Sequence, residues 1–122
     1  MWWGRGRAGV RRAQRSLCER FAAAPQFVTG PEMLGASASL MQPGIWPIRG
    51  LRHQAEGGTC GWFLYAGDYS TDDDFFQPQH ARHVLHARPE LGAYLGLPPG
   101  WGFVLAPSYE DVFQDDGILR HG

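Results

Sequence analysis

Apolar and polar positions alternate most clearly from Leu34 onward, and the pattern predicts a series of short strands. Residues 35–41 alternate apolar side chains with serine, which is the period-two pattern of a half-buried strand. A Pro-Gly turn follows, and residues 45–52 then predict a returning strand, with Pro47 favouring an edge position or a bulge. Residues 61–66 are apolar on both faces, so we expect this strand at the centre of the sheet.

The second half of the chain predicts short helices followed by further strands. An acidic loop over residues 67–74 precedes two helical patterns, one over residues 75–87 with an interruption near Gln77-Pro78 and one over residues 89–95. Residues 101–106 alternate as a strand, and residues 110–114 form a short partner for it. Strands, then short helices, then strands indicate the α+β class. We expect a small, mostly antiparallel sheet of four to five strands with one or two short helices.

Charge is distributed unevenly along the 122 residues, although the net charge is only −1. Residues 1–20 carry six arginines and one glutamate, whereas residues 68–122 carry three arginines and nine acidic residues. An acidic body is poorly suited to gripping phosphate backbones, so we expect no nucleic-acid partner. No apolar run approaches the roughly 18–20 residues that a membrane span needs, so we expect no membrane partner either.

Residues 1–33 are predicted to be a basic, flexible N-terminal arm, preceding a domain over residues 34–119. Residues 17–24 favour only two helical turns before Pro25 ends them. The arginines suit attachment to nucleic acid or a membrane, but a disordered tail, or a start codon read too far upstream of Met33, explains them as well. Deleting residues 1–30 is expected to leave thermal unfolding nearly unchanged.

Three histidines and an acidic run are the candidate metal ligands, and neither has a suitable spacing. His80 and His83 are neighbours on a helix, but His86, six residues after His80, lies about 120° around the helix from it. Residues 72–74 are consecutive aspartates and lack the alternating ligands, the glycine and the final glutamate of a calcium loop. No nucleophile elbow, phosphate loop or dinucleotide fingerprint occurs. We therefore expect no metal, no cofactor and no catalytic residue, and predict that the protein is not an enzyme.

The acidic loop contains more carboxylates than folding requires. One of them suffices to cap a following helix, and solvation explains others. A surplus also suits a basic partner, because complementary charge speeds encounter and rejects wrong partners. The candidate partner-binding residues are Asp68, Tyr69, Asp72, Asp73, Asp74, Glu110 and Asp111.

The two cysteines, Cys18 and Cys60, indicate the compartment. Their placement suggests neither a disulfide framework nor a zinc site. The basic start also lacks the apolar run of a secretory signal. We expect reduced thiols and a cytoplasmic protein.

Four blocks of sequence, in order, resemble one known family. The most specific is the Gly-Trp-Phe-Leu-Tyr-Ala-Gly-Asp run over residues 61–68, where that family has Gly-Trp-x-Phe-x-x-Gly-Asp/Glu. The others are the alternating segment 36–41, the acidic loop with its following aromatic residue and Gln77-Pro78, and residues 88–103. In this series the chain resembles the type-33 immunity-protein domain of bacterial polymorphic-toxin systems, over roughly residues 34–119. It departs at residues 46–50, where the family has an aromatic-Met-Tyr-Arg-Glu run.

The resemblance implies a binding protein that occludes a cognate toxin and needs no catalytic group. The acidic body of the chain favours a toxin with a basic surface. The alternative is a small regulatory or accessory domain on the same fold, with an unknown ligand. Whether a small molecule also binds is left open.

Overall fold

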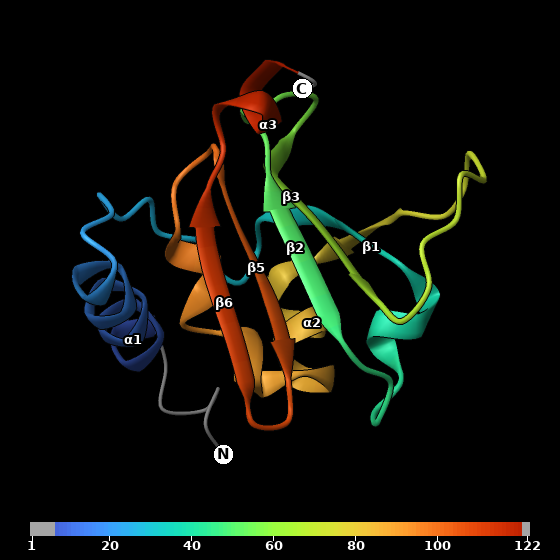
Figure 1. The fold of residues 1–122 in the computed structure, drawn as a ribbon, viewed down its shortest axis with the longest axis horizontal. Coiled ribbons are helices and arrows are strands. Elements are labelled where there is room, and N and C mark those ends of the chain that lie inside the picture. Colours follow the sequence, from blue (N-terminus) through green and yellow to red (C-terminus); the bar gives the residue numbers. More distant parts are fainter. Residues whose placement is uncertain (1–6, 121–122) are drawn as a thin grey trace.

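Six strands form one open sheet in the order β4-β1-β3-β2-β5-β6. The computed structural model describes residues 7–120 (Figure 1). β1 pairs parallel with β3, and the other four neighbouring pairs are antiparallel. The α+β class and the mostly antiparallel sheet are confirmed, but the sheet has six strands rather than four to five. The strands are β1 (Met33–Ala36), β2 (Ile48–Arg52), β3 (Thr59–Ala66), β4 (Gln77–His80), β5 (Trp101–Ala106) and β6 (Tyr109–Gln114).

Helices and short 3-10 turns cover one face of this sheet. Figure 1 views the sheet from the opposite face, with α2 behind the strands. The core between the two layers contains fully buried Trp62, Leu64 and Phe103 from the sheet and Leu85 and Leu95 from the covering layer. The helices are α1 (Arg7–Arg20), α2 (Ala81–Ala87) and α3 (Asp116–Arg120), and the 3-10 turns are η2 (Ala38–Met41), η3 (Pro89–Leu91) and η4 (Tyr94–Gly96).

The strand predicted over residues 35–41 is shorter in the structure. β1 ends at Ala36, and the hydroxyl of Ser37 accepts a hydrogen bond from the backbone N–H of Leu40, which caps η2. The serines that supplied the alternation therefore serve as a cap and as a donor to a backbone carbonyl. The prediction of a strand across the whole segment was wrong.

The returning strand was predicted correctly, but its position in the sheet was not. β2 begins at Ile48 and pairs with β3 and β5, so it lies inside the sheet rather than at an edge. Pro47 comes immediately before β2, where its missing N–H removes no ladder hydrogen bond. The prediction for residues 61–66 is confirmed, because β3 lies between β1 and β2. β5 and β6 also form the predicted antiparallel pair.

Of the helix predicted over residues 75–87, only the part after the interruption expected near Gln77-Pro78 is helical. Residues 77–80 form β4, and α2 begins only at Ala81. Pro78 explains the difference, because proline disrupts a helix interior but is tolerated in an edge strand, and β4 is at the edge of the sheet. The helix predicted over residues 89–95 is likewise replaced by two 3-10 turns.

α1 packs on the body of the protein, in contrast to the predicted flexible arm. Leu17 and Cys18 are buried, and the amide of Gln14 is fully buried. Its Nε2 donates to the carbonyl oxygens of Val28 and Gly92 at 3.3 and 3.2 Å, and its Oε1 accepts from the N–H of Val28. The charge pattern led to the wrong prediction because Arg11, Arg12, Arg15 and Arg20 lie on the exposed side of α1. Residues 1–6 of the predicted arm lie outside the described residues.

Two buried arginines hold loops in place through backbone carbonyl groups, Arg52 from β2 and Arg88 from the end of α2. Arg52 is 1 % exposed and Arg88 is 2 % exposed. Burial lowers the pKa of Arg52, because desolvation disfavours the charged form. Arg52 donates to the carbonyl oxygens of Gln26, Cys60, Leu95 and Leu97, and Arg88 to those of Leu40, Gln42 and Ile45.

Candidate functional site: the open face of the sheet

Alternation along β3 sends neighbouring aromatic residues to opposite faces of the sheet. Trp62 is fully buried under the helices, whereas Phe63 is 37 % exposed on the other face. Tyr65 follows on the same face as Phe63 and is half-buried. Leu51 of β2 lies opposite Phe63 and is also 37 % exposed. The uncovered face of the sheet, which we call the open face, therefore bears large apolar side chains.

Two rows of side chains cross the open face from β3 to β6. The first comprises Phe63, Leu51, Gly102 and Phe113, and the second comprises Tyr65, Arg49, Val104 and Asp111. A Cβ at Gly102 would lie 2.8 Å from both Leu51 Cδ2 and Phe113 Cζ. Glycine at this position therefore lets the side chains on either side approach each other over β5.

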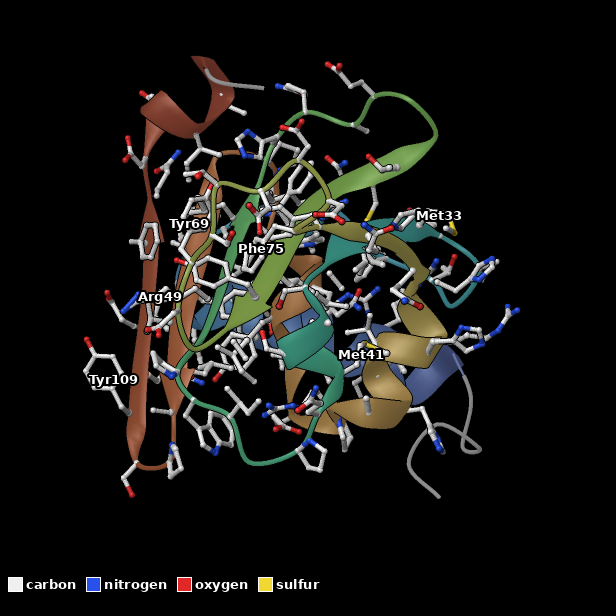
Figure 2. All side chains as sticks on the ribbon, turned by 90° about the vertical axis from the view of Figure 1, so that its right-hand side faces the viewer. Met33, Met41, Arg49, Tyr69, Phe75 and Tyr109 are labelled. Carbon is white, nitrogen blue, oxygen red and sulfur yellow. The ribbon has the colours of Figure 1, made fainter. Side chains whose placement is uncertain are left out.

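The acidic loop, residues 67–76 between β3 and β4, is held on the open face by aromatic contacts. The ring of Tyr69 lies 5.5 Å from that of Tyr65, and the ring of Phe76 lies 5.3 Å from that of Phe63. Phe75 contacts Tyr65 at 5.8 Å and Phe76 at 4.9 Å. Figure 2 shows Tyr69 and Arg49 on the side of the sheet away from α2. These edge-to-face contacts hold the loop against the sheet.

The four aspartates predicted to bind a partner lie together on this loop and are exposed. Within residues 7–120, the side chains of Asp68 and residues 72–74 take part in no hydrogen bond or ion pair with the rest of the chain. They cap no helix either, since α2 begins after His80 without a side-chain cap. Asp68, Asp72 and Asp74 instead line a hollow of about 660 Å³ together with Trp46 and Phe75.

Glu110 and Asp111, the remaining predicted acids, point to opposite faces of β6. Asp111 lies in the second row of the open face. Glu110 lies on the helix side, where its Oε1 accepts from Arg20 Nη2 at 2.6 Å and its Oε2 accepts from the hydroxyl of Tyr94. Structure thus separates Glu110 from the other six predicted residues, because it joins α1 and η4 to the edge strand.

The pKa values of this contact reflect the shared hydrogen bonds. The bonds from Tyr94 and Arg20 lower the pKa of Glu110, because they stabilise the charged carboxylate. Burial, together with the bond to Glu110, raises the pKa of Tyr94 to about 12. Both shifts favour a neutral tyrosine that donates to a charged glutamate.

A groove of about 790 Å³ lies between the acidic loop and the loop that connects β2 to β3. Of the apolar residues that line this groove, only Tyr69 was predicted from the sequence. Alternation within residues 61–66 was the available signal, but the run was read as apolar on both faces. The groove is lined by Leu51, His53, Gln54, Glu56, Gly57, Thr59, Phe63, Tyr65, Tyr69 and Phe76.

The histidines and cysteines do not form a common site. The rings of His80 and His83 lie 5.5 Å apart. Within the described part of the chain, no group of three or more His, Cys, Asp or Glu residues is placed to hold a metal ion. Cys18 and Cys60 are both free and buried, and burial raises the pKa of each thiol.

The fold and this surface define a small α+β domain whose mixed sheet has one face covered by helices and one open, aromatic face. Comparison with known families identifies the group: the Imm33-like domain model matches residues 13–115, and the chain belongs to this family. The match includes most of α1, which the sequence analysis had placed outside the domain. No curated protein and no solved structure matches the chain. Among residues 7–120, no helix combines the length and the apolar character that a bilayer crossing requires.

Proposed function

We propose that this protein is a cytoplasmic immunity protein that binds and neutralises a cognate bacterial toxin without catalysis. One observation carries the proposal: four exposed aspartates, unused by the fold, lie on a loop that aromatic contacts fix to an open sheet face. Exposed like charges repel one another, so a basic partner accounts for them better than folding does. Membership of the Imm33-like family supports a protein partner of this kind.

The contact surface is proposed to comprise the acidic loop and the two rows of the open face described above, which do not include Tyr109. Asp68, Tyr69, residues 72–74 and Asp111 are the proposed partner-binding residues. Glu110 is better assigned to holding α1, because both of its carboxylate oxygens accept hydrogen bonds within the chain. A fixed acidic rim attracts a basic toxin over distances of about a Debye length and aligns it before contact.

Co-expression with any toxin domain that the neighbouring genes encode tests the proposal. Bacteria that produce the toxin should grow only when this protein is also present, and the purified pair should form a complex of fixed stoichiometry. Inhibition should increase linearly with added protein until one equivalent is reached. Inhibition by far less than one equivalent would indicate a catalytic antidote. A fully active toxin with no complex would overturn the proposal and favour the accessory-domain alternative.

The acidic loop is tested by changing Asp72 and Asp73 together to Asn. Stability should remain within about 1 kcal/mol of wild type, because neither carboxylate has an internal partner. Association with the toxin should become slower and less dependent on salt. Stopped-flow association rates at two ionic strengths measure both effects. Glu19→Gln, which removes an exposed carboxylate from α1, is the control for the loss of negative charge elsewhere and should leave the rates unchanged.

A further inference from the structure

The groove beside the acidic loop gathers large apolar and aromatic side chains of the open face. Within residues 7–120, four large apolar or aromatic side chains are exposed, and three of them, Leu51, Phe63 and Tyr69, line this groove. Exposed apolar side chains that cluster on one face, rather than lying scattered singly, are typical of a binding surface.

The floor of the groove is already fixed without a ligand. Phe63 packs directly over Gly35 of β1, where a Cβ would lie only 2.9 Å from its ring. The ring of His53 meets Phe63 edge-to-face at 5.3 Å, and Phe76 does so at 5.3 Å from the other side. The Nδ1 of His53 lies 2.9 Å from the carbonyl oxygen of Ile118, which positions the histidine ring. A preformed floor reduces the entropy lost when a partner binds.

The charges around the groove select its occupant. Its lining includes the carboxylate of Glu56 and contains neither lysine nor arginine. The loop that contributes Tyr69 and Phe76 also carries Asp68 and residues 72–74. A second copy of this chain would bring the same acidic groups against one another, which disfavours self-association through this face. A cationic side chain on an apolar segment fits both features, because its stem packs on the aromatic floor and its charged end meets the acidic margin.

We propose that this groove anchors the toxin by taking an arginine or lysine side chain borne on an apolar segment of that protein. The inference rests on the proposed function and adds a separation of roles to it. The aspartates of the acidic loop control the rate of association, because their charge acts before contact. The groove controls the rate of dissociation, because buried aromatic contacts form only in the complex.

Tyr69→Ala is the direct test, and Tyr109→Ala is its matched control. Both tyrosines are exposed, at 59 % and 56 %, but Tyr109 lies on β6 outside the groove. Thermal unfolding should confirm that both variants fold. Tyr69→Ala should raise the rate of dissociation from the toxin by about tenfold or more and change the rate of association much less. Tyr69→Phe should restore slow dissociation, and Tyr109→Ala should match wild type.

The outcomes separate the two proposals. If wild type neutralises the toxin but Tyr69→Ala dissociates no faster than Tyr109→Ala, the proposed anchoring role of the groove is wrong and the proposed function stands. If wild type does not bind the toxin, the proposed function falls, and the anchoring role falls with it.

A peptide probe tests the chemistry of the groove without the toxin. We would titrate the full chain with acetyl-Ala-Leu-Arg-Leu-Ala-amide and follow the aromatic NMR signals of Phe63, Tyr65 and Tyr69. The arginine peptide should shift these signals more strongly than the same peptide with glutamine in place of arginine. Equal shifts with the glutamine peptide, or no shifts with either, would overturn the preference for a cation. A concentration-dependent dimer in sedimentation experiments that Tyr69→Ala abolishes would identify a second copy as the occupant instead.

Discussion

Arg52 and Trp62 donate hydrogen bonds to the same acceptor, the carbonyl oxygen of Leu95. Arg52 Nη1 lies 3.2 Å from this oxygen, and Trp62 Nε1 lies 2.8 Å from it. The two residues are also cross-strand partners in β2 and β3. The chain at η4 is therefore fixed to the middle of the sheet by two donors that are both fully desolvated.

Replacing Arg52 with Met should strongly destabilise the protein. The carbonyl oxygens that accept from Arg52 would remain buried without a partner, which costs about 3 kcal/mol or more in the free energy of unfolding. Urea unfolding measures the loss. Arg49→Met is the control, because Arg49 lies in the same strand but is exposed, and its change should stay within about 0.5 kcal/mol. Equal effects of the two substitutions would contradict the structural role of Arg52.

Truncating Leu17 to Ala should also destabilise the protein, by about 2–4 kcal/mol, because its side chain is buried between α1 and the body. This expectation reverses the one drawn from the charge distribution and the lack of apolar periodicity, in which deletion of residues 1–30 leaves thermal unfolding nearly unchanged. Arg12→Ala, on the exposed side of α1, should change stability by less than about 0.5 kcal/mol. A melting temperature unaffected by the loss of Leu17 would mean that α1 does not pack as described.

Ala22→Gly should stabilise the protein. Ala22 follows α1 with φ of 55°, in the left-handed region, and the next N–H, that of Ala23, bonds back to the carbonyl of Cys18. Glycine adopts this helix-ending conformation without strain, so we expect a gain of about 1 kcal/mol. Ala24→Gly, exposed and outside the left-handed region, should not stabilise. Differential scanning calorimetry of the two variants measures the contrast.

The contact between Arg20 and Glu110 should make the free energy of unfolding depend on pH in the acidic range. The pKa of Glu110 is lowered in the folded chain below its ordinary 4.5. Its contribution is therefore present above the pKa of the unfolded carboxyl and is lost as the pH falls through the folded pKa. The stability difference between wild type and Glu110→Gln should be largest near neutral pH and shrink below about pH 4.5.

Denaturant unfolding from pH 3 to pH 7 tests this dependence. Asp111→Asn removes the neighbouring carboxylate on the opposite face of β6, away from Arg20, and serves as the control. A stability difference for Glu110→Gln that stays constant across this range would show that the ion pair does not form in solution.

Local sequence patterns predicted those parts of the fold in which the interacting segments are adjacent in the sequence. The alternation in residues 101–106 and the short segment after it gave β5 and β6 as partners, because a two-residue turn joins them. β1 and β3 pair in parallel although β2 lies between them in the sequence. No local pattern specifies such a pairing. β4 was missed because it has only four residues and two of its side chains are exposed.

The candidate site was predictable only in its charged part. Asp68 and residues 72–74 are conspicuous in the sequence because they cluster. Phe63 and Tyr65 lie within an apolar run whose two faces cannot be ranked by sequence alone, since burial depends on where the helices pack. Glu110 has the sequence character of a surface residue that could bind a partner. In the structure it accepts a hydrogen bond from Arg20, which lies ninety residues away in the chain.

The opposite orientations of Trp62 and Phe63 have a consequence for how such domains diversify. Side chains that hold the protein together and side chains that meet other molecules occupy alternate positions of the same strands. A lineage under pressure from a changing toxin can therefore replace Phe63, Leu51 or the loop aspartates while Trp62 and Arg52 stay constant. The toxin that is recognised can then change from one descendant to the next while the fold of the domain stays the same.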